Sequence, residues 1–369
     1  MEGESKPPIH FSPPFVDAGD LEEVQKAIDS GWIAPAGPHI DAFENALKER
    51  FGYQEVLAVN SGTSALHLAL LLAGVSAGDR VLIGTFTFIA ASNVVSYLGA
   101  VPVFIDSDTH NWNVSPELLR EYVQNAKIKP KAIIVTHIFG IPALMNELLM
   151  ICEEYGIVLI EDAAEALGSK WTGRDVGTFG AFAGLSFNGN KIITTSGGGA
   201  LVLSGKKERD RGLKLATQAK EHEDHYEHLE VGFNYRMSNI LAALGLGQLS
   251  KFNEVLIRKK RIADTYKNRL STAGVIFYDS SDKQTLNHWV NPILLDGISP
   301  SDLVRKMTEE NIEARRFWKP LHLQPLHKDA LMEVNGVSEK LFNTGICLPS
   351  GAGMTEREID RVCSVMLSL

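Results

Sequence analysis

The sequence predicts an α/β protein in which a large domain, built on a mostly parallel sheet between helices, precedes a small α+β domain. Three observations support this prediction. The 369 residues are enough for two domains. Short apolar runs alternate with helical segments as far as residue 203, as in a parallel sheet covered on both faces. From about residue 251 this alternation ends. We therefore expect a large domain over residues 1–250, with an N-terminal arm at 1–19, and a small C-terminal domain over 251–369.

The elements of the large domain follow from apolar runs and from the turn residues between them. Residues 1–14 are rich in proline and should be extended, whereas residues 20–30 form an amphipathic pattern that ends at Gly31. An apolar stretch over 237–249, rich in small residues, predicts a helix that packs closely in a core or between subunits. The other expected strands are 55–59, 80–84, 101–106, 132–136, 158–160, 180–187 and 199–203, and the other expected helices are 40–51, 64–73 and 89–98.

The small domain is expected to combine helices and strands. A basic stretch over 256–270 predicts a long helix with a solvated face, and Ser299 followed by Pro300 is a typical helix start. The expected strands are 275–278, 288–295 and 313–316, and the other expected helices are 300–311 and 355–367. Residues 317–325, rich in proline, aromatic residues and histidine, should form a loop between the last strand and the last helix.

Composition and charge exclude several classes of function. A net charge of −9 argues against a nucleic-acid partner, because phosphate backbones require a basic surface. The three cysteines lack metal-ligand spacing, and the polar N-terminus and the absence of a long apolar run indicate a soluble, cytoplasmic protein without a membrane anchor. The histidine-rich segment 221–228 could bind a metal, but we interpret it as a solvated loop and expect no metal.

Lys191 is the first candidate for catalysis. It stands in the small and apolar stretch 184–199, with Arg174 and Lys206 as the nearest basic residues. Such a lysine is either a surface charge or a working amine, because burial disfavours the ammonium form and makes the amine a better nucleophile.

Two further signals accompany this lysine. Asp162 follows the buried strand 157–160, and open α/β sheets place ligands at the carboxyl ends of their strands. The turn Gly62-Thr63-Ser64 opens an apolar helix, and such a helix start binds phosphate readily. Each signal alone could be only a helix cap. Together they match pyridoxal phosphate, which needs an amine for a Schiff base, an acid for its ring nitrogen and a cradle for its phosphate.

Six ordered motifs make the chain resemble the DegT/DnrJ/EryC1/StrS family of pyridoxal phosphate-dependent nucleotide-sugar aminotransferases, which have the aspartate aminotransferase-like fold type I. The motifs lie at residues 31–35, 60–66, 85–88, 161–164, 186–191 and 232–237 and span nearly the whole chain.

This resemblance implies a role for each candidate residue. Lys191 and Asp162 would be catalytic, with Lys191 as the Schiff-base lysine and proton carrier and Asp162 on the ring nitrogen. Glu165 stands where many family members have glutamine and would lie near the ring. The other implied cofactor contacts are Gly62, Thr63, Ser64, Phe88, Ser186 and Asn234, and the implied substrate contacts are Asn190, Trp318 and His322.

The same resemblance implies a reaction and its partners. L-Glutamate would donate its amino group through pyridoxamine phosphate to the C4 keto group of a nucleotide-linked 4-keto-6-deoxy sugar, and we favour a UDP-linked N-acetylhexosamine in bacterial surface-glycan or glycoprotein biosynthesis. Asn234 would reach the phosphate of a neighbouring subunit, so a homodimer with shared active sites is expected. Three alternatives stay open, namely C3 amination or a dTDP- or GDP-linked sugar, an amino-acid aminotransferase using Arg315 or Arg316, and a non-catalytic regulator.

Overall fold

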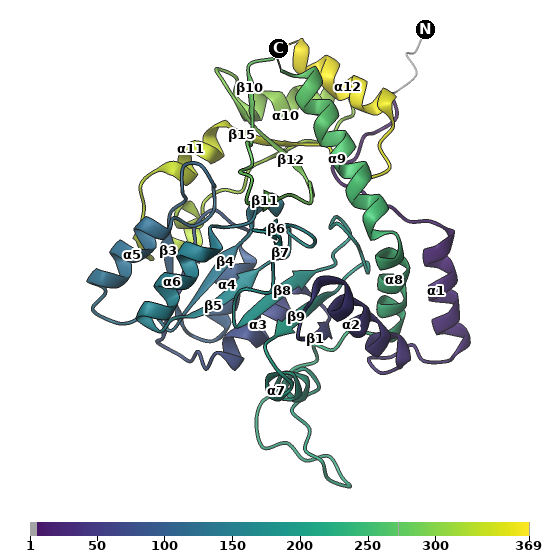
Figure 1. The fold of residues 1–369 in the computed structure, drawn as a ribbon, viewed down its shortest axis with the longest axis vertical. Coiled ribbons are helices and arrows are strands. Elements are labelled where there is room, and N and C mark those ends of the chain that lie inside the picture. The colour runs from purple at the N-terminus through teal and green to yellow at the C-terminus, as the bar shows by residue number, and fades with distance from the viewer. Residues whose placement is uncertain (1–5, 272, 369) are drawn as a thin grey trace.

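The computed structural model describes residues 6–271 and 273–368 and is built around an eight-stranded sheet (Figure 1). The strands β8, β5, β4, β2, β3 and β14 run parallel to one another, while β9 is antiparallel to both β8 and β1. In spatial order, the strands are β1 (Glu55–Val59), β9 (Gly199–Leu203), β8 (Phe182–Ser186), β5 (Val158–Asp162), β4 (Ala132–Thr136), β2 (Arg80–Gly84), β3 (Val101–Ile105) and β14 (Leu331–Glu333). The predicted α/β class with a mostly parallel sheet is therefore confirmed.

Both faces of this large sheet are buried, which explains why its strands are apolar at successive positions. In β4, Ile134 packs on one face with α3 and α4, whereas Ile133 and Val135 pack on the other face with α5 and α6. The helices of this part are α1 (Ala18–Asp29), α2 (Pro38–Phe51), α3 (Gly62–Leu72), α4 (Ala90–Tyr97), α5 (Pro116–Asn125), α6 (Met145–Tyr155), α7 (Lys206–Ala216) and α8 (Asn239–Ser250). A parallel sheet enclosed in this way directs the carboxyl ends of β2, β4, β5 and β8 to one edge.

A second, antiparallel sheet lies near the C-terminus, at the top of Figure 1. Its apolar core joins Ile293 and Ile346 of the sheet to Ile262, Leu303 and Ile359 of the neighbouring helices. Its strands, in spatial order, are β10 (Val275–Phe277), β12 (Asn291–Leu295), β15 (Gly345–Leu348) and β13 (Arg315–Arg316), and its helices are α9 (Phe252–Arg269), α10 (Pro300–Glu309) and α12 (Glu356–Leu367). A third small sheet contains β11 (Gln284–Thr285), β6 (Lys170–Trp171) and β7 (Arg174–Asp175).

The two main parts are connected by α8 and α9, which follow each other in the chain with a bend of 61° between them. The chain crosses back after β13, because β14 returns to the large sheet and pairs with β3. The division of the chain near residue 250 stays a prediction. Among the described residues no single helix has the length and apolarity of a membrane span, and only the bent pair α8 and α9 would pass as one together.

The sequence prediction for the region before the last helix was wrong. We expected residues 313–316 to be the last strand, but β14, α11 (Val337–Thr344) and β15 follow it. Short 3-10 turns, Leu321–Leu323 and Pro325–His327, occupy the expected loop. The predicted strand 288–295 begins only at Asn291, because His288 has a φ of 51°, which a strand does not adopt.

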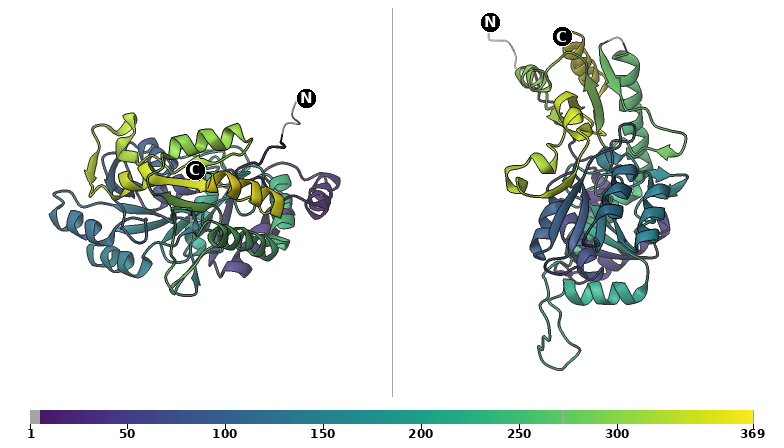
Figure 2. Two further views of the ribbon diagram at one scale, coloured as in Figure 1. Left: turned by 90° about the horizontal axis from the view of Figure 1, so that it is seen from above. Right: turned by 90° about the vertical axis from the view of Figure 1, so that its left-hand side faces the viewer.

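The segment between α7 and α8 extends away from the body of the molecule (Figure 2, right). It contains the histidine-rich stretch, in which His225 contacts the carboxylates of Asp224 and Glu227. Large apolar side chains are exposed here, including Tyr226, Leu229 and Val231. In the described part of the chain, no group of three or more histidine, cysteine or acidic residues is arranged to hold a metal ion.

Candidate active site

A cavity of about 370 Å³ opens at the carboxyl edge of the large sheet, where the two main parts of the chain meet. It contains most of the residues that the sequence singled out. The predicted residues that line it are Gly62, Thr63, Phe88, Asp162, Glu165, Ser186, Asn190, Lys191 and Trp318. They come from α3, from the segment after β2, from the ends of β5 and β8, and from the segment after β13.

Lys191 lies between two carboxylates and an indole ring. Its Nζ atom is 3.8 Å from Oε1 of Glu165 and 3.9 Å from the centre of the Trp289 ring. Burial lowers the pKa of Lys191, while the negative charges of Glu165 and Asp162 act in the opposite direction. The amine is therefore closer to its neutral, nucleophilic form at neutral pH than an exposed lysine would be.

Asp162 ends β5 and is held at the floor of the cavity. Its Oδ1 atom accepts a hydrogen bond of 3.2 Å from the backbone N–H of Ala164. Burial raises the pKa of Asp162, and the Ala164 N–H, Lys191 and His137 oppose that rise. A buried carboxylate in this position is suited to pair with a cation, because pairing offsets the cost of removing its charge from water.

Glu165 is fixed one turn further along. Its Oε2 atom accepts a 2.7 Å hydrogen bond from the N–H of Phe139, which has a positive φ of 55° that non-glycine residues rarely adopt. Burial also raises the pKa of Glu165. The fixed carboxylate lies beside the Lys191 amine.

The start of α3 forms a compact cradle. Ser61 caps this helix by accepting a 3.0 Å hydrogen bond from the N–H of Ser64, and Gly62 and Thr63 stand in the first turn. A Cβ atom on Gly62 would lie 3.1 Å from Cβ of Ser186, and one on Gly199 would lie 2.5 Å from the Gly62 nitrogen. The two glycines thus allow the first turn of α3 to sit against β8 and β9, where its free N–H groups can meet an anion.

The cavity also presents a free polar atom and an open aromatic face. The buried Oδ1 atom of Asn190 has no hydrogen-bond partner among the described residues. The Phe88 side chain is 50% exposed, and its ring centre is 5.2 Å from that of Trp318. An amine, a buried carboxylate, an anion cradle, a free polar atom and an open aromatic face fit pyridoxal phosphate and a polar substrate.

Three predicted residues do not line this cavity. The hydroxyl of Ser64 donates to Oδ1 of Asn60, so it serves the helix cap. His322 is buried between Thr85 and Glu339, with ring nitrogens 2.8 and 3.2 Å from their side-chain oxygens. Asn234 is exposed on the segment before α8, and its carbonyl accepts from Nδ2 of Asn60.

Other residues line the cavity without having been predicted for it. Trp289 comes from the segment before β12, and no sequence pattern marked it because its place depends on how the two parts of the chain pack. Arg315, considered only for an alternative function, also lines the cavity and stacks on Phe11. The remaining lining residues are Asn60, Ser61, Leu66, Thr87, Ala90, Thr136, Ala164, Asn188, Gly197 and Gly198.

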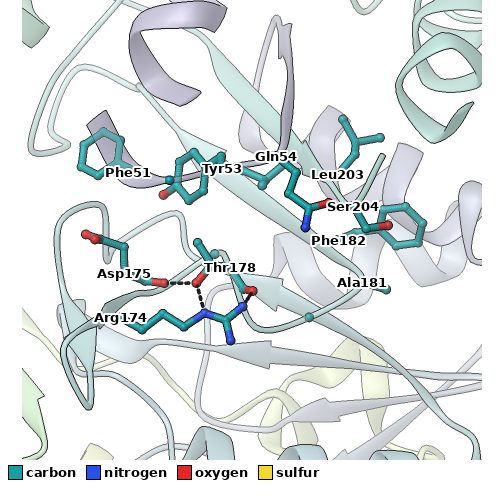
Figure 3. Close-up of a pocket in the computed structure, with 14 residues that line it drawn as sticks. Phe51, Tyr53, Gln54, Arg174, Asp175, Thr178, Ala181, Phe182, Leu203 and Ser204 are labelled. Carbon is teal, nitrogen blue, oxygen red and sulfur yellow. Dashed lines mark hydrogen bonds between the residues drawn. The ribbon is translucent and has the colours of Figure 1, made fainter. Parts of the chain in front are cut away.

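A second cavity, of about 310 Å³, lies at the opposite edge of the large sheet (Figure 3). It is lined by the start of β8 and the end of β9, and Arg174 projects along its wall. The Nε atom of Arg174 donates to Oγ1 of Thr178 at 2.8 Å. None of the predicted site residues lines this cavity.

The fold and the cavity at the carboxyl edge define a pyridoxal phosphate-dependent aminotransferase of fold type I. A family model described as the DegT/DnrJ/EryC1/StrS aminotransferase family matches residues 14–367. The chain therefore belongs to this family, as its motifs indicated, and it is a sugar aminotransferase.

Individual relatives agree with this assignment. The chain is 46% identical to EpsN of Bacillus subtilis (strain 168), described as a candidate pyridoxal phosphate-dependent aminotransferase, over 98% of this chain and 95% of EpsN. It is 36% identical to the GDP-perosamine synthase of Escherichia coli O157:H7, over 95% of each chain. A solved DegT DnrJ EryC1 StrS aminotransferase from Brucella abortus matches the fold with a TM-score of 0.88 and 28% identity, over 95% of each chain.

Proposed function

We propose that this enzyme moves the amino group of L-glutamate to the C4 keto carbon of a nucleotide-linked 4-keto-6-deoxy sugar. The first candidate acceptor is the UDP-linked N-acetylhexosamine, for bacterial surface-glycan or glycoprotein biosynthesis. The observation that carries the proposal is the position of the Lys191 amine, beside Glu165 in a cavity that also contains Asp162. The same cavity presents Phe88, Asn190 and Trp318.

The residues divide the chemical work between them. When bound, pyridoxal phosphate supplies a carbonyl that carries the amino group and a ring that accepts electrons. Asp162 would keep the ring nitrogen protonated, and the first turn of α3 with Ser186 would hold the phosphate. Lys191 would take a proton from the donor carbon and return one to the acceptor carbon, a role that its lowered pKa supports. Glutamate would leave as 2-oxoglutarate, and the keto sugar as an amino sugar.

A GDP-linked 4-keto-6-deoxy sugar is the second candidate acceptor. Relatives named GDP-perosamine synthase, which act at C4 of a GDP-linked sugar, match this chain at 33–36% identity. This observation favours C4 over C3 amination for either nucleotide.

The proposal includes a homodimer. Asn234 is exposed and lies outside the cavity of its own chain, as expected for a residue that serves a second subunit. In a mixture of Lys191→Ala and Asn234→Ala chains, one intact site can form from two defective partners. Recovery of activity on mixing would support shared sites, and its absence would contradict them.

The substrate proposal is tested by incubating the enzyme with L-glutamate and each keto sugar in parallel. We expect 2-oxoglutarate to form beyond the single equivalent per site that glutamate alone releases only when a 4-keto-6-deoxy sugar nucleotide is present. NMR of the product should place the amine at C4. Turnover with the GDP-linked sugar alone would select the second candidate, and an amine at C3 would contradict the proposed position. Transfer between amino acids and keto acids without any sugar would support an amino-acid aminotransferase instead.

A further inference from the structure

Lys259 of α9 is buried without a counter-ion. Its side chain is 3% exposed, and no carboxylate of the described residues contributes to its pKa, which burial lowers to about 7. A buried charge without a counter-ion costs several kcal/mol unless hydrogen bonds offset it. The groups that accept hydrogen bonds from Lys259 therefore decide what this side chain does.

The ammonium group bridges three segments that are distant in sequence. Its Nζ atom donates to the carbonyl oxygen of Trp289 at 2.9 Å and to that of Ser350 at 2.7 Å. A longer contact of 3.5 Å reaches the hydroxyl of Ser12 in the N-terminal arm. That hydroxyl gives its own hydrogen to Asn190, so it can only accept from Lys259. The ammonium form can donate to all three groups, whereas a neutral amine has two hydrogens and can serve only the two carbonyls.

Two of these three segments converge on the residue before Lys191. The carbonyl oxygen of Asn190 accepts a hydrogen bond of 2.6 Å from Nε1 of Trp289 and one of 3.1 Å from Oγ of Ser12. The Trp289 ring, which is 2% exposed, also lies 3.9 Å from the Lys191 amine. One buried ammonium thus fixes both groups that hold the backbone at Asn190, and it fixes the ring against which the amine rests.

We propose that Lys259 is a positioning residue that sets the place of the Lys191 amine through Trp289, Ser12 and the carbonyl of Asn190. This role goes beyond the proposed function and does not depend on which sugar the enzyme accepts. It concerns how readily the Lys191 amine meets the aldehyde of pyridoxal phosphate.

The test compares Lys259→Met, Lys259→Arg and Lys260→Met. Methionine keeps an unbranched apolar stem, one atom shorter than lysine, and cannot donate, whereas arginine keeps both the charge and the donors. Lys260 is the exposed neighbour on the same helix, and its ammonium group binds the carboxylate of Asp264. For each variant, two quantities are measured, namely the urea midpoint of unfolding and the rate at which pyridoxal phosphate attaches to the cofactor-free protein, followed by absorbance.

We expect Lys259→Met to attach the cofactor about tenfold more slowly or worse, because a small displacement of a reacting group is costly. Its urea midpoint should also fall, because the buried carbonyls of Trp289 and Ser350 lose their donor. Lys259→Arg should recover most of the rate, and Lys260→Met should match the wild type. A wild-type attachment rate in Lys259→Met would overturn the proposal, as would a loss of stability without a change in rate.

A second variant decides the question if Lys259→Met does not fold. Trp289→Phe keeps the carbonyl that Lys259 binds, removes the donor to Asn190 and leaves a smaller ring beside the Lys191 amine. It should also slow attachment, and a wild-type rate would contradict the positioning role. If wild-type protein fails to attach the cofactor, the assignment of Lys191 fails instead, so the two failures are distinguishable.

Discussion

The Lys191 amine lies 3.8 Å from the carboxylate of Glu165, a residue that stands where many members of the family have glutamine. Opposite charges this close favour the ionised form of each group. Burial acts against both charges, lowering the pKa of Lys191 and raising that of Glu165. The state of the nucleophile therefore depends on a balance between burial and this one neighbour.

Glu165→Gln should lower the pKa of the Lys191 ammonium group. The carboxylate raises the pKa of Lys191, so replacing it with a neutral amide lets burial lower that pKa further. The neutral amine then persists to lower pH. In a plot of the rate of cofactor attachment against pH, the fall on the acid side should therefore occur at a lower pH than in the wild type. The glutamine oxygen can still accept from the Phe139 N–H, so stability should change little. If the rate falls at the same pH as in the wild type, or at a higher pH, this account of Glu165 is contradicted.

Asp162→Asn should abolish most of the activity without harming the fold. The amide can still accept from Ala164, but it cannot hold a proton on the ring nitrogen by charge. We expect kcat to fall roughly 10²–10³-fold, as when a preorganised electrostatic partner is removed. Because burial raises the pKa of Asp162, its ionised form costs stability above that pKa, so the neutral variant should unfold at the same urea concentration or higher. Retained kcat would show that Asp162 has another role.

Phe88→Ala should weaken cofactor binding with little effect on folding. Half of the side chain is exposed, so little apolar burial is lost on truncation. Loss of a stacked ring should raise the Kd for the cofactor by about tenfold, corresponding to roughly 1.4 kcal/mol. Phe88→Leu should be intermediate. The Kd is measured by equilibrium titration of the cofactor-free protein. An unchanged Kd would show that the Phe88 ring does not stack on the cofactor.

Asp106→Asn should destabilise the return of the chain to the large sheet. The buried carboxylate accepts from the N–H groups of Ser107, Asn335, Gly336 and Ser338 at 2.7–3.0 Å, which ties the start of α11 to the end of β3. An amide turns one acceptor into a donor that faces other donors, so we expect a loss of about 2–4 kcal/mol in the free energy of unfolding. Asp79→Asn, at an exposed turn, should cost under about 1 kcal/mol. Equal losses at both positions would refute the argument.

The sequence was most informative where one local pattern decides the structure. The apolar strand 157–160 followed by acids predicted that Asp162 ends a buried strand at the ligand edge, and the cavity contains it. The turn before residue 64 predicted the start of α3 for the same reason. In both places the neighbouring residues determine the backbone conformation. The parallel arrangement of the strands determines at which edge of the sheet these residues lie.

Long-range packing explains what sequence reasoning missed. β14 has three residues, two of them exposed, and it is a strand only because the edge of β3 is free to pair with it. Trp289 belongs to a run expected to be a strand, and its ring lies beside Lys191 while Lys259 of α9 holds its carbonyl. His322 was expected at the substrate, yet Thr85 and Glu339 occupy its two nitrogens.

The central claim is that the amine of Lys191 binds the cofactor and takes part in amino transfer. The most direct test is the absorption spectrum of the protein with pyridoxal phosphate, before and after L-glutamate, for the wild type and for Lys191→Ala. We predict a band of lysine-bound cofactor in the wild type that disappears when glutamate is added, and no such band in the variant. The same band in Lys191→Ala, or no band in the wild type, would contradict the claim.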